Sequence, residues 1–356
     1  MSIMKSNIIK LFCGIGLLCG FCACHNGDIE FPDYEGGTTV YFAYQYPVRT
    51  IVLGDDEYDT TLDKAHKCQI KATFGGSYNG SNGSVQVAVD NSLCNNLTFA
   101  DGTPVKAMPA DYYQLSTTSL DFKGSMYGTT DVQLTDAFFN DPNAVKNTYV
   151  IPLRMISQTG FGKILEGTLL EGQSGSRCDE SIWEVKPMDY ILYCVKFQNK
   201  YSGWWLTNGT TSTNDIEKAQ TVQIKTRSMN TCTYTVSYLK KYIAKTFDDA
   251  GNEVAKEEER IYTADLLLTF DGSDKCTVTS LTPGVTATGT GSWGDDSEKN
   301  AWGNKDRDGL ELNYTVDFNA VDDYGNAIEK GITHEKMVWQ RSGVKFEEFS
   351  PIYVNQ

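Results

Sequence analysis

The sequence of 356 residues is long enough for two domains of ordinary size and carries a formal net charge of −15. This acidity disfavours binding to nucleic acid or docking on anionic lipid, because both require clustered lysine and arginine. It is compatible with a neutral, highly hydroxylated ligand, and it keeps the protein soluble.

The first residues predict an export signal rather than part of a fold. Lys5 and Lys10 form a basic head, and the apolar run over residues 8–18 is too short to span a bilayer. The run is followed by Ala23-Cys24, a small residue before a cysteine, which resembles the signal of bacterial lipoproteins. The resemblance implies that residues 1–23 are a signal peptide and that Cys24 is lipidated. The alternative is an ordinary secretory signal rich in cysteine.

Residues 24–37 contain Gly, Pro and several acids, and they are interpreted as an acidic tether. An acidic stretch after the lipidated cysteine also resembles the tag that sends some lipoproteins to the outer face of the outer membrane. The alternative is a solvated linker with no address. No later stretch approaches the ~18 to 20 apolar residues of a spanning helix. We therefore expect a cell-surface protein, held at the outer membrane by a lipid anchor only.

Residues 38–157 predict an N-terminal, Ig-like antiparallel β-sandwich. The segment 38–46 is rich in β-branched and aromatic residues, and valine occupies every second position from 85 to 89. Several short strands with no long helical period are typical of a sandwich. Residues 158–187, rich in Gly and Ser, are interpreted as a linker or long loop.

Residues 188–356 predict about eight further antiparallel strands, so the whole fold is expected to be all-β. Every second residue from Leu310 to Phe318 is apolar. Local hairpins favour a C-terminal lipocalin-like β-barrel, with a second β-sandwich as the alternative. The similar segments 247–253 and 321–327 are interpreted as Asp/Asn turns, because they offer too few oxygen ligands for a calcium loop.

The cysteines outside the signal show no metal-binding pattern, because there is no CxxC pair and no companion histidine. An oxidising compartment would permit disulfides, but three of these cysteines lie in strand-like runs, where buried free thiols are common. We expect at most one or two disulfides, with a pairing that the sequence does not reveal. The six residues are Cys68, Cys94, Cys178, Cys194, Cys232 and Cys276.

Short motifs in both halves resemble a known pair of domains. Residues 39–51 (TVYFAYQYPVRTI), residues 90–93 and the Pro-x-x-Tyr-Tyr run at 109–113 are similar to the N-terminal domain of surface lipoproteins from polysaccharide-utilisation systems of gut bacteria. Residues 289–293 and 302–314 are similar to the lipocalin-like domain that often follows it. The resemblance implies a Sus-type outer-membrane lipoprotein that captures oligosaccharides beside a transporter complex. It brings no catalytic residues with it.

No catalytic constellation is recognisable in the sequence. The histidines at positions 25, 66 and 334 are isolated, and there is no GxSxG or HExxH motif. Glycosidases need two facing carboxylates, but the DxxDxDxE run of chitinase-like barrels is absent, and the acidic segment 306–311 is interpreted as a salt-bridged turn. We expect no enzymatic activity, no cofactor and no metal.

Aromatic side chains form the expected ligand site, because tryptophan and tyrosine rings stack on the apolar faces of sugars. Two tryptophans bracket the polar loop 294–301, although they could instead plug and cap the barrel. Two more are adjacent at 204 and 205, so they point to opposite faces of a strand, and at most one is expected in the core. The aromatic residues at 41–46 are expected to pack in the sheet. The expected ligand-binding residues are Trp293, Trp302, Trp204, Trp205, Tyr201, Asp295, Asp296 and Asn300.

These features together predict a non-catalytic, glycan-binding surface lipoprotein whose binding is saturable and insensitive to salt. One alternative is a lipocalin-like carrier of a small apolar ligand, which needs an empty apolar lumen. The inward tyrosines expected at 234, 238 and 314 disfavour it. Another alternative is a surface adhesin or protein-interaction module, which would require a large exposed apolar patch.

Overall fold

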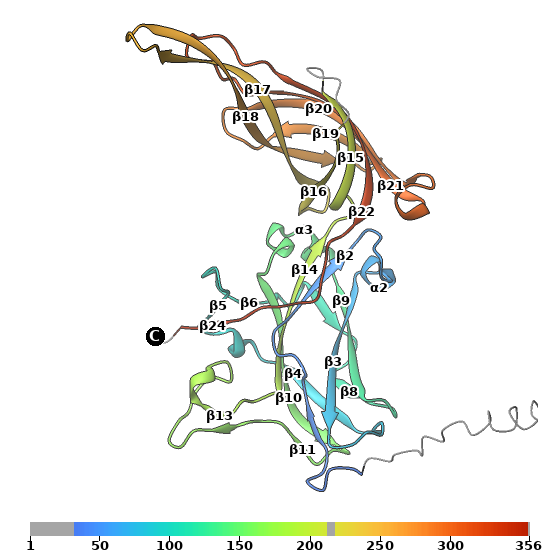
Figure 1. Cartoon of the computed structure of the whole chain (residues 1–356). Helices are drawn as coiled ribbons and strands as arrows, with labels where there is room; N and C mark the ends of the chain where they lie inside the picture. Colours follow the sequence, from blue (N-terminus) through green and yellow to red (C-terminus); the bar gives the residue numbers. More distant parts are fainter. Residues whose placement is uncertain (1–31, 212–217, 355–356) are drawn as a thin grey trace, which may run out of the picture.

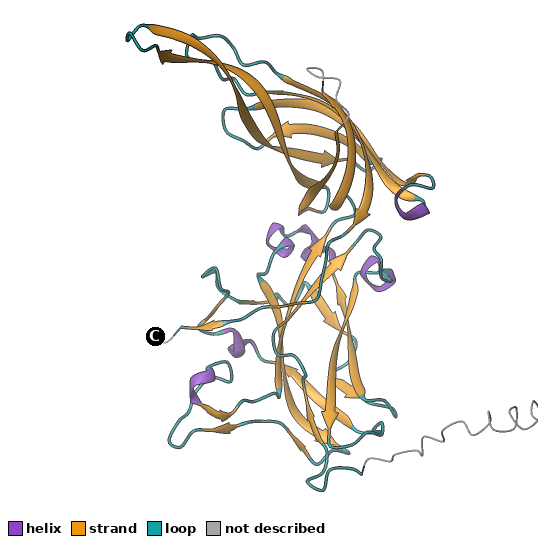
Figure 2. Cartoon of the chain, in the orientation of Figure 1, coloured by secondary structure: helices purple, strands orange, loops and turns teal. Residues whose placement is uncertain are grey.

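The computed structural model describes residues 32–211 and 218–354 and is all-β, with 54% strand and 7% helix. Figure 1 shows two domains: a sandwich built by the N-terminal half and a barrel built by most of the C-terminal half. Figure 2 shows that the helices are confined to short turns. The predicted fold class is confirmed, and the second domain is a closed barrel rather than a second sandwich. The signal segment and Cys24 lie outside the described residues.

The sandwich packs a five-stranded sheet against a seven-stranded sheet. The first sheet contains, in spatial order, β11 (Lys163–Ile164), β1 (Thr39–Tyr41), β3 (Lys67–Gly75), β9 (Tyr127–Leu134) and β7 (Tyr113–Leu115). The second contains β23 (Glu347–Glu348), β2 (Pro47–Val52), β14 (Tyr190–Gln198), β10 (Tyr149–Thr159), β4 (Ser84–Val89) and β8 (Ser119–Asp121), with β6 (Lys106–Ala107) beside β10.

Short elements lie between and beside the strands of these sheets. Two are small two-stranded pairings, and the rest are single helical turns. They are β5 (Leu97–Thr98) with β24 (Ile352–Tyr353), β12 (Thr168–Leu169) with β13 (Trp183–Val185), α2 (Thr61–Lys64), α3 (Asp136–Asn140), η2 (Asn91–Cys94), η3 (Pro142–Val145) and η4 (Glu180–Ile182).

The sandwich is not antiparallel throughout, in contrast to the prediction. β1 pairs with β11, β2 with β14, and β6 with β10 in parallel. Parallel neighbours need a crossover rather than a tight hairpin. Sequence spacing reveals hairpins more readily than crossovers, because hairpin turns carry local residue signals.

Strand β14 belongs to the sandwich, which moves the boundary between the domains. Every second residue from Ile191 to Phe197 faces the core between the sheets, whereas Tyr190, Leu192 and Cys194 belong to a second core on the outer face. A continuous apolar run is typical of a strand covered on both sides. The sandwich therefore extends to Gln198, and the barrel begins near Gly203 rather than at the predicted residue 188.

Residues 158–187 also belong to the sandwich domain and are more than a linker. Phe161 is buried in the main core, and β11 lies beside β1 in the five-stranded sheet. Arg177 donates from Nε to both carboxylate oxygens of buried Asp189, at 3.0 and 2.9 Å. The end of the segment predicted as a tether, residues 24–37, also contacts this domain. The backbone N–H of Tyr34 donates to the carbonyl oxygen of Gly76.

The barrel consists of eight consecutive antiparallel strands, and it closes because the first pairs with the last. The predicted alternation is confirmed, since every second residue from Leu310 to Phe318 is buried inside. The strands are β15 (Gly203–Thr211), β16 (Lys218–Ser228), β17 (Thr231–Phe247), β18 (Glu253–Phe270), β19 (Lys275–Ser280), β20 (Thr286–Glu298), β21 (Arg307–Asp317) and β22 (Gly331–Arg341), with the turn η5 (Trp302–Asn304) before β21.

The β17–β18 hairpin extends past the barrel as an arm (Figure 1). Its turn is built on Asp248, whose carboxylate accepts from the backbone N–H groups of Ala250 and Asn252. Asp322 forms the same turn in the loop before β22. Both segments are therefore Asp/Asn turns, as their sequences predicted.

The C-terminal segment returns from the barrel to the sandwich, although it was assigned to the barrel from sequence. After β22 the chain runs along the sandwich, where β23 pairs with β2 and β24 with β5 (Figure 1). Phe349 is buried there, with its ring centroid 5.5 Å from that of Tyr46 and 5.1 Å from that of Phe99. We call residues 342–354 the C-terminal strap. The domains are thus joined twice, by residues 199–202 and by the strap.

Within the described residues, no helix combines the length and the apolarity needed to cross a membrane.

Candidate functional site

Trp204 and Trp205 are neighbours on β15, and only one of them is accessible. Trp205 is 0% exposed in the barrel core. Trp204 points to the other face, where it is half-buried and its ring lies 5.6 Å from the guanidinium carbon of Arg341. The alternation of side chains along a strand explains this split. Trp205 therefore serves the core, and Trp204 remains available to a ligand.

Tyr201 and Trp293 meet at the mouth of the barrel, where they pack instead of forming an open platform. The Tyr201 ring stacks on Phe270 with a centroid distance of 3.7 Å, and the Trp293 ring meets it edge-on at 5.7 Å. The Tyr201 hydroxyl donates to Asp274 at 2.6 Å, and the Lys200 ammonium lies 4.2 Å from the Trp293 ring centroid. Trp293 therefore helps to close the barrel mouth, as the alternative to a ligand contact predicted.

Residues 294–301 were predicted to be a polar loop, but β20 continues to Glu298, and the turn after it is held by its own hydrogen bonds. Trp302 is 48% exposed, and its backbone carbonyl accepts from Arg307 Nε at 3.0 Å. The backbone N–H of Asn300 donates to Asp306, which also pairs with Lys299 at 2.8 Å. Trp302 thus provides a single accessible ring, without Trp293 as an exposed partner.

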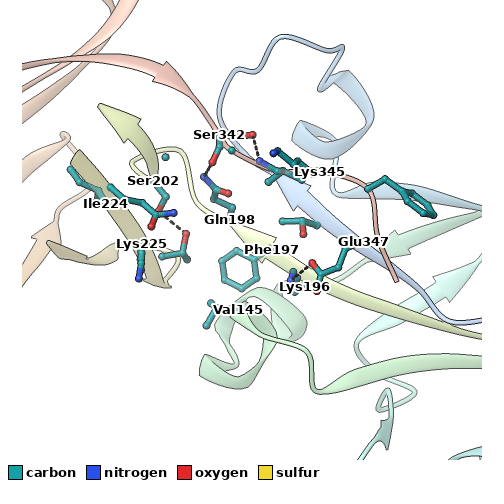
Figure 3. A pocket seen from close by; sticks show the side chains of 17 residues that line it. Val145, Lys196, Phe197, Gln198, Ser202, Ile224, Lys225, Ser342, Lys345 and Glu347 are labelled. Atoms are coloured by element: carbon teal, nitrogen blue, oxygen red, sulfur yellow. Dashed lines mark hydrogen bonds and ion pairs between the residues drawn. The ribbon is translucent and has the colours of Figure 1, made fainter. Parts of the chain in front are cut away.

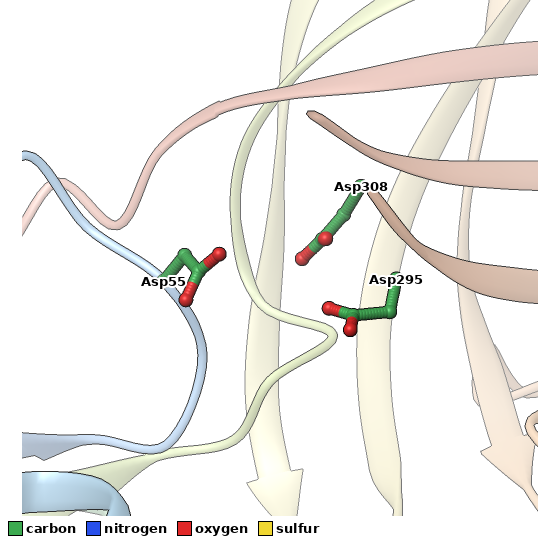
Figure 4. Close-up of side chains that lie close together, drawn as sticks. All are labelled: Asp55, Asp295 and Asp308. Atoms are coloured by element: carbon green, nitrogen blue, oxygen red, sulfur yellow. The ribbon is translucent and has the colours of Figure 1, made fainter. Parts of the chain in front are cut away.

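Asp295 approaches two other carboxylates at the junction of the domains (Figure 4). Asp55, Asp295 and Asp308 each place an oxygen within 4.8 Å of the others. Asp308 is 4% exposed; its burial raises the pKa of that carboxyl to about 6, although the backbone N–H of Asp296 donates to it at 3.0 Å. Carboxylate oxygens suit Ca²⁺ or Mg²⁺. Here the ion pair of Asp55 with Lys64 already reduces the repulsion among the three carboxylates.

A cleft of about 510 Å³ opens between the two domains (Figure 3). It is bounded by the end of β14, by residues 223–226 of β16 and by residues 342–347 of the strap. Several of the side chains that line it form hydrogen bonds, among them Gln198, Ser202 and Thr226. We call this space the interdomain cleft.

Aromatic rings flank the interdomain cleft. Phe346 lines it and is 70% exposed, and its ring centroid lies 5.2 Å from that of Tyr44, which is 52% exposed. Gly343 lines the wall beside Trp204: a Cβ there would lie 2.6 Å from the indole Nε1, and φ is +79°. Tyr44 was expected to pack in the sheet, but it lies in the loop between β1 and β2, so its ring remains accessible.

A second cleft of about 510 Å³ also lies between the domains and is lined by Lys64, His66, Lys200 and Tyr201. Its lysines are neutralised, because Lys64 pairs with Asp55 and Lys200 with Asp274. The His66 ring packs 4.1 Å from that of Phe139. This cleft has fewer groups free to bind a ligand.

The barrel interior is filled by side chains, including the three tyrosines expected to point inward. Glu335 is buried and accepts hydrogen bonds from Tyr234 at 2.8 Å, Tyr314 at 2.6 Å and Thr207 at 3.3 Å. Burial raises the pKa of Glu335 even though these bonds favour the ionised form. Tyr238 is also buried and bonds to Thr333. A carrier would need an empty apolar lumen, and these side chains do not provide one.

The exposed aromatic pair at the interdomain cleft, Phe346 in its lining and Tyr44 beside it, was missed in the sequence because the two residues come from distant segments. Tyr44 precedes β2, and Phe346 follows the last barrel strand. Only one local signal existed: Ser342-Gly343 interrupts the apolar alternation of β22 and marks the point where the chain leaves the barrel.

Two family models match separate parts of the chain. Residues 198–343 match a domain of unknown function (DUF5627), and residues 34–162 match a family described as an N-terminal domain. A multidomain protein including DUF1735 from Bacteroides ovatus shares 12% identity over 84% of this chain and 93% of that chain, with a TM-score of 0.37. No curated protein matches.

A crystal structure of a second Bacteroides ovatus protein, of unknown function, is more similar. It shares 32% identity with this chain, covers 91% of this chain and 100% of its own, and has a TM-score of 0.72. The chain therefore belongs to the same family as this Bacteroides ovatus protein.

Proposed function

We propose that this protein is a non-catalytic surface lipoprotein that binds oligosaccharides for uptake by a polysaccharide-utilisation system. The interdomain cleft is the observation that carries the proposal, because its walls combine hydrogen-bonding side chains with the exposed ring of Phe346, which lies against Tyr44. A sugar ring presents hydroxyl groups around its edge and apolar C–H groups on its faces. Concave sites with a few placed polar groups and aromatic surface suit such ligands.

Several polar groups along the interdomain cleft remain able to bind hydroxyls. Gln198 donates from its side-chain nitrogen to the carbonyl of Ser342 at 3.3 Å, which leaves its side-chain oxygen as an acceptor (Figure 3). Gln223 is exposed and has both a donor and an acceptor. The exposed ring of Phe346 lies on the same cleft and offers a stacking surface.

The cellular setting of the proposal comes from the sequence. Lipidation at Cys24 would place the protein at the outer membrane, and the acidic tether would present the domains on the cell surface. The similarity to a Bacteroides protein supports this setting. A transporter complex of Sus type is the proposed recipient of the bound oligosaccharide.

The test is calorimetry on residues 25–356 with oligosaccharides selected on a glycan array. We expect saturable binding without shortened products, and Phe346→Ala should weaken it roughly 3- to 10-fold, the range of one aromatic contact. Tyr127→Ala is the matched control, because Tyr127 is an exposed aromatic residue on β9 of the sandwich. Loss of binding in Trp302→Ala with no change in Phe346→Ala would show that the ligand binds at the barrel turn that carries Trp302 and not in the interdomain cleft. Shortened products would contradict the non-catalytic assignment.

A further inference from the structure

We propose that the oligosaccharide bound in the interdomain cleft is acidic, with carboxylate or sulfate groups that pair with Lys225 and Lys345. This inference rests on the proposed function, because it specifies the ligand class of the same cleft. It comes from the distribution of charge around the cleft.

The lining of the interdomain cleft is basic, although the protein is strongly acidic. Three lysines and one glutamate line it, which gives a net charge of +2. The chain as a whole has 46 acidic and 31 basic residues. A concave surface with one sign of charge concentrates ligands of the opposite sign.

Two of these lysines have no acidic partner within the part of the chain that the structure describes. Lys196 is neutralised by Glu347 at 2.8 Å, and Glu347 also accepts from Asn147 at 3.1 Å (Figure 3). Lys225 and Lys345 are exposed, and neither forms an ion pair with a described residue. The second cleft differs, because its lysines are paired with aspartates.

The positive surface continues along the neighbouring strands. Gln223 and Lys225 are exposed at alternate positions of β16, so their side chains share one face, and exposed Arg227 follows at the irregularity between Thr226 and Ser228. Arg341 lies against Trp204 at the end of β22, beside the wall formed by Gly343. Arg227 and Arg341 have no acidic partner among the described side chains either. A chain of several charged or sulfated sugars would therefore meet further cations outside the cleft.

The proposal changes the expected effect of salt. The net charge of −15 was compatible with a neutral ligand, and the glycan-binding hypothesis predicted binding insensitive to salt. At physiological ionic strength the screening length is about 8 Å, so the charges within the cleft outweigh distant acids. Binding is then expected to weaken as salt increases.

The experiment is calorimetry on residues 25–356 with three oligosaccharides of equal length, at 50 and 300 mM NaCl. The probes are an oligogalacturonate, a chondroitin sulfate oligosaccharide and a neutral cello-oligosaccharide, which separate carboxylate, sulfate and uncharged ligands. The variant is Lys225→Gln with Lys345→Gln. The matched control is Lys241→Gln with Lys299→Gln, two exposed lysines away from the cleft, which changes the net charge equally.

We expect an acidic probe to bind at least 10-fold more tightly than the neutral one at 50 mM NaCl. The cleft variant should lose about 10-fold for that acidic probe and show a weaker dependence on salt, whereas the control variant should bind like the wild type. Binding of either acidic probe in this way supports the proposal. Equal affinity for the neutral probe, with no effect of the cleft variant, overturns it while the proposed function stands. Absence of binding to any oligosaccharide, including those of a broad glycan array, overturns both.

Discussion

Replacing the two adjacent tryptophans of β15 one at a time tests the register of the barrel. Trp205 is 0% exposed in the barrel core. Complete burial of its side chain removes roughly 200 Å² from water, or about 5 kcal/mol at 25 cal/mol per Å². Because large-to-small substitutions of buried aromatic residues cost about 3–5 kcal/mol, we expect this loss for Trp205→Ala. Trp204 is only half-buried, so Trp204→Ala should cost about 1–2 kcal/mol.

The assay is guanidinium denaturation of residues 25–356, followed by far-UV circular dichroism. The two domains can unfold in separate steps, and the loss in Trp205→Ala should fall on the step that belongs to the barrel. Trp204→Ala serves as the matched control, since it removes the same side chain one position away. Equal losses in both variants, or a larger loss for Trp204→Ala, would refute the assigned faces of β15.

Three further predictions concern titration, thiols and the strap. Burial raises the pKa of Asp308 from 3.8 to about 6, so its contribution to stability is fully present below about pH 3.8 and is lost as the pH rises through about 6. Asp308→Asn should therefore stabilise the protein by up to about 3 kcal/mol at pH 7.5 and by little at pH 4, as measured by denaturation at both pH values; a gain independent of pH would contradict this. All six cysteines of residues 25–356 are free, and burial raises their thiol pKa values to about 11 or 12. Because the thiolate is the reactive form, Ellman's reagent should react slowly with the folded protein. After denaturation the same reagent should count six thiols. A count below six would reveal a disulfide. Phe349→Ala should cost the sandwich about 3 kcal/mol, because it detaches the strap from Tyr46 and Phe99, and an unchanged denaturation midpoint would show that the strap is not anchored there.

The regular alternation of apolar and polar residues made the barrel strands predictable from sequence, because it indicates a strand with one buried face. The residues from Leu310 to Phe318 show this pattern, and the structure buries them inside the barrel. The run from Tyr190 to Phe197 has no alternation, since β14 is buried on both faces. Such a run does not reveal which domain it belongs to. From sequence it was assigned to the barrel domain, whereas it is a strand of the sandwich.

The candidate site was less predictable than the fold, because the interdomain cleft is assembled from segments far apart in sequence. The end of β14, the middle of β16 and the strap meet only after both domains have formed. The predicted loop at 294–301 is contiguous in sequence and was therefore easier to recognise. Trp293 lies at the barrel mouth because the alternation of β20 directs it inward, and no sequence motif reports that geometry.

Net charge also proved a poor guide to local charge. The value of −15 is a sum over the whole chain, whereas a ligand responds to groups within about one screening length. Lys225 and Lys345 are 120 positions apart, yet they line one cleft.

The most direct test of the central claim is a glycan array probed in parallel with residues 25–356 of the wild type and of Phe346→Ala. We expect the wild type to bind a family of related oligosaccharides and the variant to give much weaker signals for the same family. Silence of the wild type across the array, or equal signals from the two proteins, would contradict oligosaccharide binding in the interdomain cleft.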